Sequence, residues 1–132
     1  MIHMLDTNIC VYIMNDKPAH VAERLRAFSL NDIAISSIVL SELSFGVYKS
    51  THFKRNLALL ESFIKPIQVI SYDNVAAFQY GELRTELERE GAPIGQLDMM
   101  IAAHALSLSA TLVSNNLKEF SRVKGLRCEN WA

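Results

Sequence analysis

The sequence predicts a three-layer α/β/α domain with a mainly parallel central sheet of four to five strands. Short apolar runs alternate with longer amphipathic segments along all 132 residues, which is the pattern of a parallel sheet covered by helices. Half of the residues are hydrophobic, which is enough for one packed core. No repeat, linker or low-complexity tract interrupts the alternation, so we expect a single domain over residues 1–132.

Each expected strand is a short apolar run that ends at a polar or turn residue. The five runs are residues 1–5, 32–36 (DIAIS), 67–70 (IQVI), 111–113 (TLV) and about 126–128. Ligands bind to open parallel sheets at the carboxyl ends of the strands. Asp6 and the run Ser114-Asn115-Asn116 each follow one of these strands, so we expect them at the ligand-binding edge.

Helices are expected in the intervals between the strands. They cover residues 10–14, 18–28, 36 to about 46, 53–64, 73–90, 96–108 and about 117–120. Pro18 is expected at a first helical position, where its missing N–H is tolerated. Gly46 is expected to interrupt or end its helix. Asp73 opens the longest helix, in which Arg84 and Glu88 are spaced for an ion pair.

Composition excludes several classes of protein. No run approaches the ~18 apolar residues of a membrane span, and the first residues lack the basic and apolar regions of an export signal. Cys10 and Cys128 stand far apart and are expected to be free thiols, so we expect a cytoplasmic protein with no membrane association. The net charge of −1 gives no global field for nucleic acid. Any RNA binding must therefore use a local basic patch or a partner subunit.

Three carboxylates, Asp6, Glu42 and Asp98, stand in apolar surroundings. Each has an ordinary explanation: Asp6 as a helix cap, Glu42 at an exposed helix edge, and Asp98 in a first turn, where the helix dipole favours negative charge. Taken one at a time, these explanations are favoured. Taken together they are not, because several buried carboxylates without a neighbouring Lys or Arg need protons or a cation.

A hard divalent cation suits these carboxylates, because no set of His or Cys ligands accompanies them. Mg²⁺ and Mn²⁺ prefer oxygen ligands and bind phosphates. Such a site can hydrolyse a phosphodiester by activating water and stabilising the leaving oxygen. The residues thus predict a metal-dependent phosphodiester hydrolase, with Mg²⁺ as the metal and Mn²⁺ able to substitute.

Longer motifs carry a family resemblance. They are LDTN (5–8) after a hydrophobic run, ISSIVLSEL (35–43), RNLA (55–58), GAPIGQLDMMIAAHAL (91–106), TLVSNNLKEF (111–120) and ENW (129–131). In this order they span essentially the whole chain. They closely resemble the PIN-domain ribonucleases, and among these the VapC toxins of bacterial VapBC toxin–antitoxin pairs. The resemblance implies a PIN-like fold.

The resemblance also implies roles for individual residues. Asp6, Glu42 and Asp98 correspond to the three family carboxylates that hold the metal. Thr7 and Asn8 are implied to orient Asp6. Ser114, Asn115 and Asn116 lie where the family often has Thr/Ser-Asn-Asp, so that Asn116 replaces a fourth acid. Either one metal ion suffices, or Glu119, one helical turn further on, supplies the missing charge; we favour a contribution from Glu119.

Substrate and partners follow from the resemblance in the same way. It implies a toxin that cuts structured RNA, in this subgroup initiator tRNA(fMet) in the anticodon stem-loop. It implies a homodimer that a cognate VapB antitoxin inhibits by laying a C-terminal segment across the acidic site. Operator DNA would be bound only through VapB.

Two basic clusters are candidates for RNA contacts. The first is Lys49, His52, Lys54 and Arg55, for which RNA binding and a solvated helix face are equally favoured. The second is Lys118, Arg122, Lys124 and Arg127, for which RNA contact is slightly favoured. His104, in an apolar helix, is expected to be a packed core residue and not a ligand.

Three other functions are consistent with parts of the sequence. A phosphatase of the haloacid-dehalogenase type would need a second acid two residues after Asp6, but that residue is Asn8. A receiver domain would need an Asp at the end of the third strand, where the chain has Ser71. A catalytically weak PIN scaffold that binds RNA or antitoxin without efficient cleavage remains the alternative, because Asn116 replaces an acid.

Overall fold

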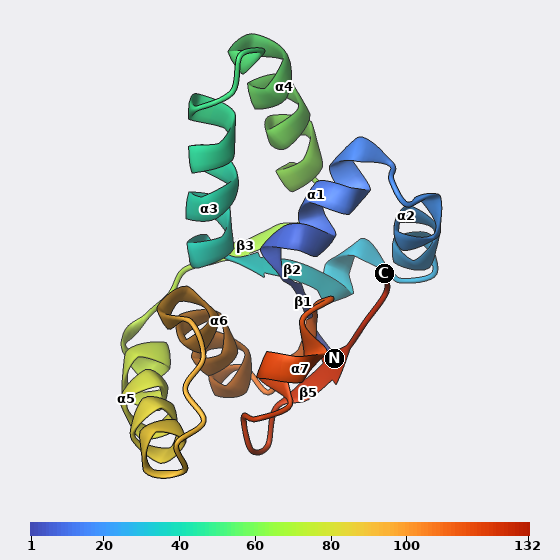
Figure 1. Ribbon diagram of the computed structural model, residues 1–132. Coiled ribbons are helices and arrows are strands. Elements are labelled where there is room, and N and C mark those ends of the chain that lie inside the picture. Colours follow the sequence, from blue (N-terminus) through green and yellow to red (C-terminus); the bar gives the residue numbers. More distant parts are fainter.

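The computed structural model describes residues 1–132 and contains one five-stranded, all-parallel sheet (Figure 1). Its strands are β1 (His3–Leu5), β2 (Ile33–Ser36), β3 (Gln68–Ile70), β4 (Thr111–Val113) and β5 (Arg127–Glu129). They are arranged in the order β3-β2-β1-β4-β5, and all four pairings are parallel. The predicted α/β/α fold with a parallel sheet is therefore confirmed. The chain order reverses between β1 and β4, and Asp6 follows the first of these strands directly.

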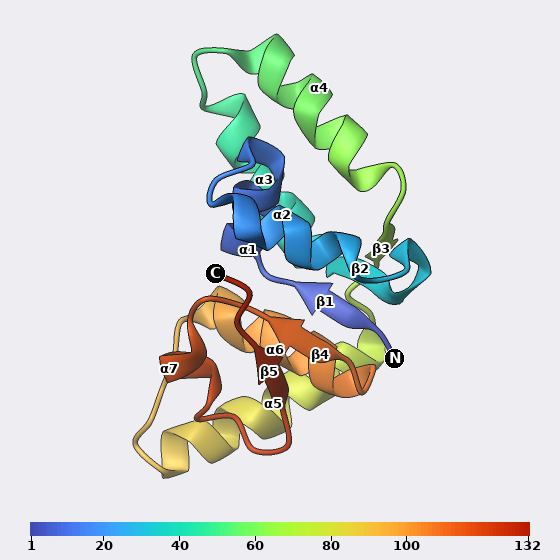
Figure 2. The same ribbon diagram turned by 90° about the vertical axis from the view of Figure 1, so that its right-hand side faces the viewer.

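Helices cover both faces of the sheet (Figure 2). They are α1 (Thr7–Asn15), α2 (Ala19–Arg26), α3 (Ser37–Tyr48), α4 (Phe53–Ile64), α5 (Asn74–Arg89), α6 (Gln96–Ser107) and α7 (Leu117–Phe120), with a 3₁₀ turn at Leu30–Asp32. In Figure 2, α1 and α2 lie on one side of the sheet, and α5 and α6 lie on the other. The helices α3 and α4 form an antiparallel hairpin that extends beyond the sheet (Figure 1).

Strand register brings the carboxyl ends of β1, β4 and β5 to one edge. Leu5 is level with Val113, and Val113 is level with Glu129. Two backbone hydrogen bonds continue the ladder past the strands: Asp6 donates to Val113, and Ser114 donates to Glu129, each over 2.9 Å. Asp6 and Ser114 therefore emerge side by side from adjacent strands, as expected for residues at the edge of a parallel sheet.

Several boundaries differ from the sequence expectation. Gly46 neither interrupts nor ends α3, because Val39, Leu43 and Val47 form a buried stripe that holds the helix to Tyr48. Pro18 is the residue before α2 and has an extended ψ of 145°, so it is not the first helical residue. The first helix begins at Thr7, earlier than expected, because Asp6 caps it. Arg84 and Glu88 form the expected ion pair, at 2.9 Å.

A cluster of 25 buried hydrophobic residues forms the core on both faces of the sheet. Met4, Ile35 and Leu112 are fully buried within it. His104 is 1% exposed, and its Nδ1 lies 2.8 Å from the Ser36 hydroxyl, which confirms a packed core histidine. Both cysteines are free thiols. None of the helices has the length and apolar character needed to cross a bilayer.

Candidate active site

Asp6 is buried at the sheet edge and is held by two donors. The Thr7 backbone N–H donates to Asp6 Oδ1 and the Ser114 hydroxyl donates to Oδ2, each over 2.8 Å. Asp6 thus caps α1, which is the ordinary explanation, and is also joined to the end of β4. Burial raises the pKa of Asp6, although the bonds from Ser114 and Thr7 lower it.

Glu42 on α3 is joined to the same region by Thr7. The Thr7 hydroxyl donates to Glu42 Oε1 over 2.7 Å, while its backbone N–H serves Asp6. The role that the resemblance implies for Thr7, to orient Asp6, stays a prediction: its backbone N–H contacts Asp6, and its side chain contacts Glu42. One residue at the first position of α1 therefore connects two of the predicted carboxylates.

Asp98 in the first turn of α6 lies within hydrogen-bonding reach of Glu119 on α7. Burial, the negative charge of Asp6, and the contact with Glu119 raise the pKa of Asp98 to about 7, and the charge of Glu42 adds to the effect. The Asn116 amide donates to Glu119 Oε2 over 3.1 Å and so holds this second carboxyl in place. The raised pKa favours the uncharged form of Asp98 beside these other carboxylates.

These four carboxylates influence one another without a basic partner. The ion pairs of the chain involve Glu129, Glu88, Glu86 and Glu90, and none involves Asp6, Glu42, Asp98 or Glu119. No three acidic, His or Cys side chains form a ready-made metal site. The donor chemistry consists of carboxylate oxygens without a neighbouring cation, with a raised pKa at Asp6 and at Asp98, and it fits a hard divalent ion. The side chains would have to turn towards one another to bind it.

Two predicted residues lie beside the carboxylates without contacting them. Asn8 Nδ2 lies 3.5 Å from Asn115 Oδ1, and Asn115 Nδ2 donates to the Tyr12 hydroxyl over 2.9 Å. The implied role of Asn8 in orienting Asp6 stays a prediction, because the contact of its side chain is with Asn115. Asn116 contributes its backbone N–H to the Ser114 hydroxyl over 2.9 Å. Tyr12 is not among the residues predicted for the site, although its i, i+4 spacing from Asn8 places both on one face of a helix.

Comparison with known proteins decides the family. The PIN domain family matches residues 3–126. The chain is 49% identical to ribonuclease VapC2 of Rickettsia felis over 132 residues, which is 99% of this chain and 98% of the relative. The chain belongs to the VapC family of PIN-domain ribonucleases. The family resemblance and the prediction of a nuclease are thus confirmed.

Other VapC relatives agree with this assignment. The tRNA(fMet)-specific endonuclease VapC of Shigella flexneri is 49% identical over 98% of this chain and 97% of its own. The structure of VapBC2 from Rickettsia felis, bound to a DNA fragment from its promoter, superimposes with a TM-score of 0.94 at 47% identity, with both chains fully covered. DNA-bound VapBC from Salmonella typhimurium gives 0.94 at 45% identity, covering 100% of this chain and 99% of that one. VapC proteins are the toxins of such pairs.

An apolar groove lies next to Glu42 in this VapC fold. It has a volume of about 270 Å³ and opens between α1, α3 and α4. Its apolar walls are Val11, Met14, Leu43, Val47 and Leu59, and its polar rim includes Thr7 and Glu42. The groove therefore ends at one of the predicted carboxylates, Glu42, and at the threonine that donates to it.

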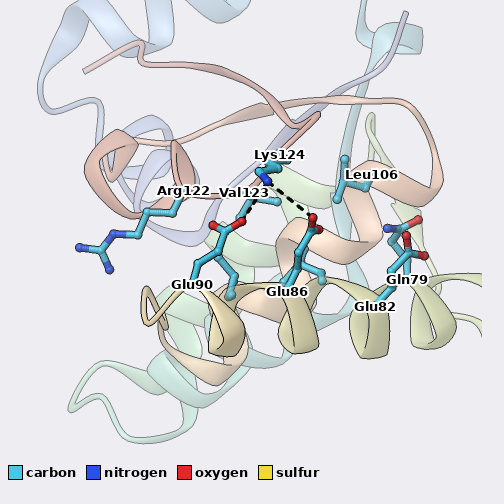
Figure 3. A pocket seen from close by; sticks show the side chains of 10 residues that line it. Gln79, Glu82, Glu86, Glu90, Leu106, Arg122, Val123 and Lys124 are labelled. Atoms are coloured by element: carbon cyan, nitrogen blue, oxygen red, sulfur yellow. Dashed lines mark ion pairs between the residues drawn. The ribbon is translucent and has the colours of Figure 1, made fainter.

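The two basic clusters differ in their contacts. Lys49, Lys54 and Arg55 are exposed around the tip of the α3–α4 hairpin (Figure 1). In the second cluster, Arg122 donates to the Pro93 carbonyl over 3.0 Å. Lys124 lies 3.0 Å from Glu90 and 3.8 Å from Glu86 (Figure 3). Arg127 is bonded to the Ser109 carbonyl, so Lys118 is the residue of this cluster without such a contact.

Proposed function

We propose that this chain is an Mg²⁺-dependent endoribonuclease that cuts structured RNA, namely initiator tRNA(fMet) in the anticodon stem-loop, as the toxin of a VapBC pair. The observation that supports this proposal is that, in addition to burial, the charges of Asp6, Glu42 and Glu119 all act on Asp98 and raise its pKa. The four carboxylates come from separate parts of the chain and have no Lys or Arg partner. Carboxylates brought together without a positive partner lower the stability of the fold, unless they bind a cation that in turn contacts the scissile phosphate.

The residues have distinct tasks in this proposal. Asp6, Glu42 and Asp98 hold the Mg²⁺, for which Mn²⁺ can substitute, and Glu119 adds the fourth negative charge. The ion, when bound, supplies an activated water and stabilises charge on the leaving oxygen. Ser114 and the Thr7 backbone donate to the two oxygens of Asp6 and so favour its ionised form against the effect of burial.

The substrate is inferred from relatives. Two of them, from Shigella flexneri and Salmonella typhimurium, are named tRNA(fMet)-specific endonucleases, and they are 49% and 48% identical to this chain over nearly its full length. At this similarity the substrate class is expected to be shared. Lys49, Lys54, Arg55 and Lys118 are proposed to bind RNA phosphates, because they are exposed cations on a chain of net charge −1.

Partners are inferred from solved complexes and from the surface. Solved structures of VapBC pairs match this chain over its whole length. We propose that a cognate VapB occupies the acidic edge with a C-terminal segment and binds operator DNA on behalf of the pair. A homodimer is proposed because α5 exposes Val75 by 63% and Phe78 by 83%, and such apolar surface is typical of a covered face. Residues 1–132 are proposed to act as one domain in the cytoplasm.

Cleavage of initiator tRNA by purified protein tests the function. Asp6→Ala, Glu42→Ala and Asp98→Ala are each expected to lower the rate by about 100-fold or more. EDTA is expected to abolish cleavage, and Mg²⁺ or Mn²⁺ to restore it. Glu61→Ala is the matched control, because Glu61 is exposed on α4 and makes no ion pair. Cleavage that withstands EDTA and all three substitutions would contradict the metal mechanism.

The alternative is a scaffold that binds RNA or VapB with little cleavage. The observation that favours it is Asn116, whose amide replaces the acid that the resemblance implies and binds metal more weakly than a carboxylate. Failure of the wild-type protein to cut any RNA in the presence of Mg²⁺ or Mn²⁺ would favour the scaffold.

A further inference from the structure

Three polar side chains form a chain of hydrogen bonds on the surface beside Asp6. Asn8 and Tyr12 lie four residues apart on α1, and Asn115 follows β4. Asn115 Nδ2 donates to the Tyr12 hydroxyl over 2.9 Å, and Asn8 Nδ2 approaches Asn115 Oδ1 at 3.5 Å. We call these three residues the lip triad, because they border the group of carboxylates.

The fold itself gains little from the lip triad. Asn8 and Asn115 are exposed, and the Tyr12 ring already packs against the core without help from its hydroxyl. Solvent-exposed hydrogen bonds between side chains add little to the free energy of unfolding, because they replace hydrogen bonds with water. Ordering each side chain also costs conformational entropy. The arrangement is therefore better explained as a surface organised in advance for a ligand than as a structural support.

The free atoms of the lip triad define the kind of ligand. Asn8 keeps its carbonyl oxygen and one N–H, Asn115 keeps a second N–H, and Tyr12 keeps its O–H proton. An adjacent amide donor and acceptor match the edge of a nucleobase. Unpaired RNA bases are commonly read on their edges and stacked on aromatic rings, and Tyr12 is a partly exposed aromatic residue.

The lip triad lies next to Asp6, because two of its residues are close neighbours of Asp6 and Ser114 in the sequence. Asn8 is two residues after Asp6, and Asn115 directly follows Ser114, which donates to Asp6 Oδ2. A nucleotide held here would have its neighbouring phosphate at the carboxylates. We propose that the lip triad binds an unpaired nucleotide adjacent to the cleaved phosphodiester and selects its base. This inference rests on the proposed ribonuclease function.

The test compares Asn8→Ala, Tyr12→Phe and Asn115→Ala with Asn31→Ala, a control that removes an exposed amide elsewhere on the surface. The first readout is fluorescence anisotropy of a labelled RNA hairpin in EDTA, which measures binding without cleavage. The second is sequencing of the ends produced, with Mg²⁺, from a hairpin library with randomised loops. Thermal unfolding identifies any variant that is simply destabilised, and Tyr12→Phe keeps the packed ring in every case.

Each lip-triad variant is expected to raise the Kd about tenfold and to relax the base preference beside the cut, with an unchanged melting temperature. An unchanged Kd and base preference in all three variants would overturn the inference, even if the wild type cuts RNA normally. A wild type that binds the hairpin but never cuts it would contradict the ribonuclease proposal alone, since the binding comparison still stands. A wild type that binds no RNA would overturn both.

Discussion

The Ser114 hydroxyl donates to Asp6 Oδ2 across a sequence separation of 108 residues, and both groups are buried. The same hydroxyl accepts the backbone N–H of Asn116. Ser114 therefore connects the first strand, the fourth strand and the segment that leads to Glu119. Its hydrogen bond lowers the pKa of Asp6 against the effect of burial, which favours the ionised form that a metal requires.

Ser114→Ala is expected to destabilise the protein by about 1–3 kcal/mol, because it leaves buried partners unsatisfied. It also raises the pKa of Asp6 further, so the acidic limb of the pH–rate profile should move to higher pH. Urea unfolding and cleavage rates between pH 5 and 9 measure the two effects. Ser121→Ala, at an exposed hydroxyl, is the control. An unmoved acidic limb would show that Ser114 does not tune Asp6.

Thr7→Val is expected to raise the Mg²⁺ concentration for half-maximal cleavage by about tenfold, because Glu42 loses the donor that fixes its carboxylate. The Thr7 backbone N–H still serves Asp6 in this variant, so the change isolates the contact with Glu42. Thr7→Ser keeps the hydroxyl and should behave as the wild type. The effect is measured by titrating the cleavage rate with Mg²⁺. Equal half-maximal Mg²⁺ concentrations for the Val and Ser variants would show that the Thr7 hydroxyl does not assist metal binding.

Asp98→Asn is expected to stabilise the metal-free protein at pH 8 but not at pH 4. The pKa of Asp98 rises from 3.8 to about 7 on folding, so its contribution to stability is present below pH 3.8 and is lost as pH rises towards 7. Removing the charge should raise the free energy of unfolding at pH 8 by about 1 kcal/mol and the melting temperature by about 3 °C. The gain is small because Asp98 is partly exposed to solvent, which weakens the repulsion between the carboxylates. Thermal unfolding in EDTA measures it.

Asp16→Asn is the control for Asp98→Asn. Asp16 is exposed at the left-handed C-cap of α1, where Asn is equally well tolerated. A gain of the same size at pH 4 and pH 8 for Asp98→Asn would mean that charge repulsion at the sheet edge is not its cause.

Glu119→Gln is expected to raise the Mg²⁺ requirement about tenfold, because it removes the fourth negative charge while keeping the shape of the side chain. Asn116→Asp in the same protein should restore the requirement, since it places an acid where the resemblance implies one. Titration of cleavage with Mg²⁺ measures both. A Glu119→Gln variant with the wild-type midpoint would indicate that Asp6, Glu42 and Asp98 suffice with one metal ion.

Lys54→Ala combined with Arg55→Ala is expected to weaken RNA binding and to lower the slope of log Kd against log salt by about 1.4, since each single-strand phosphate contact contributes about 0.7. Lys65→Ala, at the far end of α4, should leave the slope unchanged. Arg122→Ala should have less effect, because its guanidinium already serves the Pro93 carbonyl. Equal slopes for the double variant and the wild type would show that the tip of the α3–α4 hairpin does not contact RNA phosphates.

The sequence was sufficient to predict the sheet and the edge where Asp6 and Ser114 meet, because parallel strands bring their carboxyl ends together. It was not sufficient to predict which side chains bond at that edge. The hydroxyl of Thr7 donates to Glu42 and not to Asp6 because α3 packs beside α1. The amide of Asn115 donates to Tyr12, whose position depends on the first turns of α1.

The second basic cluster illustrates the same limit. A run of cations next to the predicted site suggested RNA contact, but α5 brings Glu86 and Glu90 up to Lys124 (Figure 3). Residues that far apart in sequence become neighbours only through the packing of α5 against the segment after α7. Local charge patterns predict exposure well, but they do not reveal which exposed charges are already paired.

The position of β5 makes the predicted site depend on a segment that contributes no acidic residue to it. Ser114 is held at the sheet edge by the carbonyl of Glu129 in β5. The Ser114 hydroxyl in turn donates to Asp6, which follows β1, so the two outer parts of the chain are linked through one serine. A deletion that removes β5 is therefore expected to loosen Asp6, although every carboxylate of the predicted site stays in the protein.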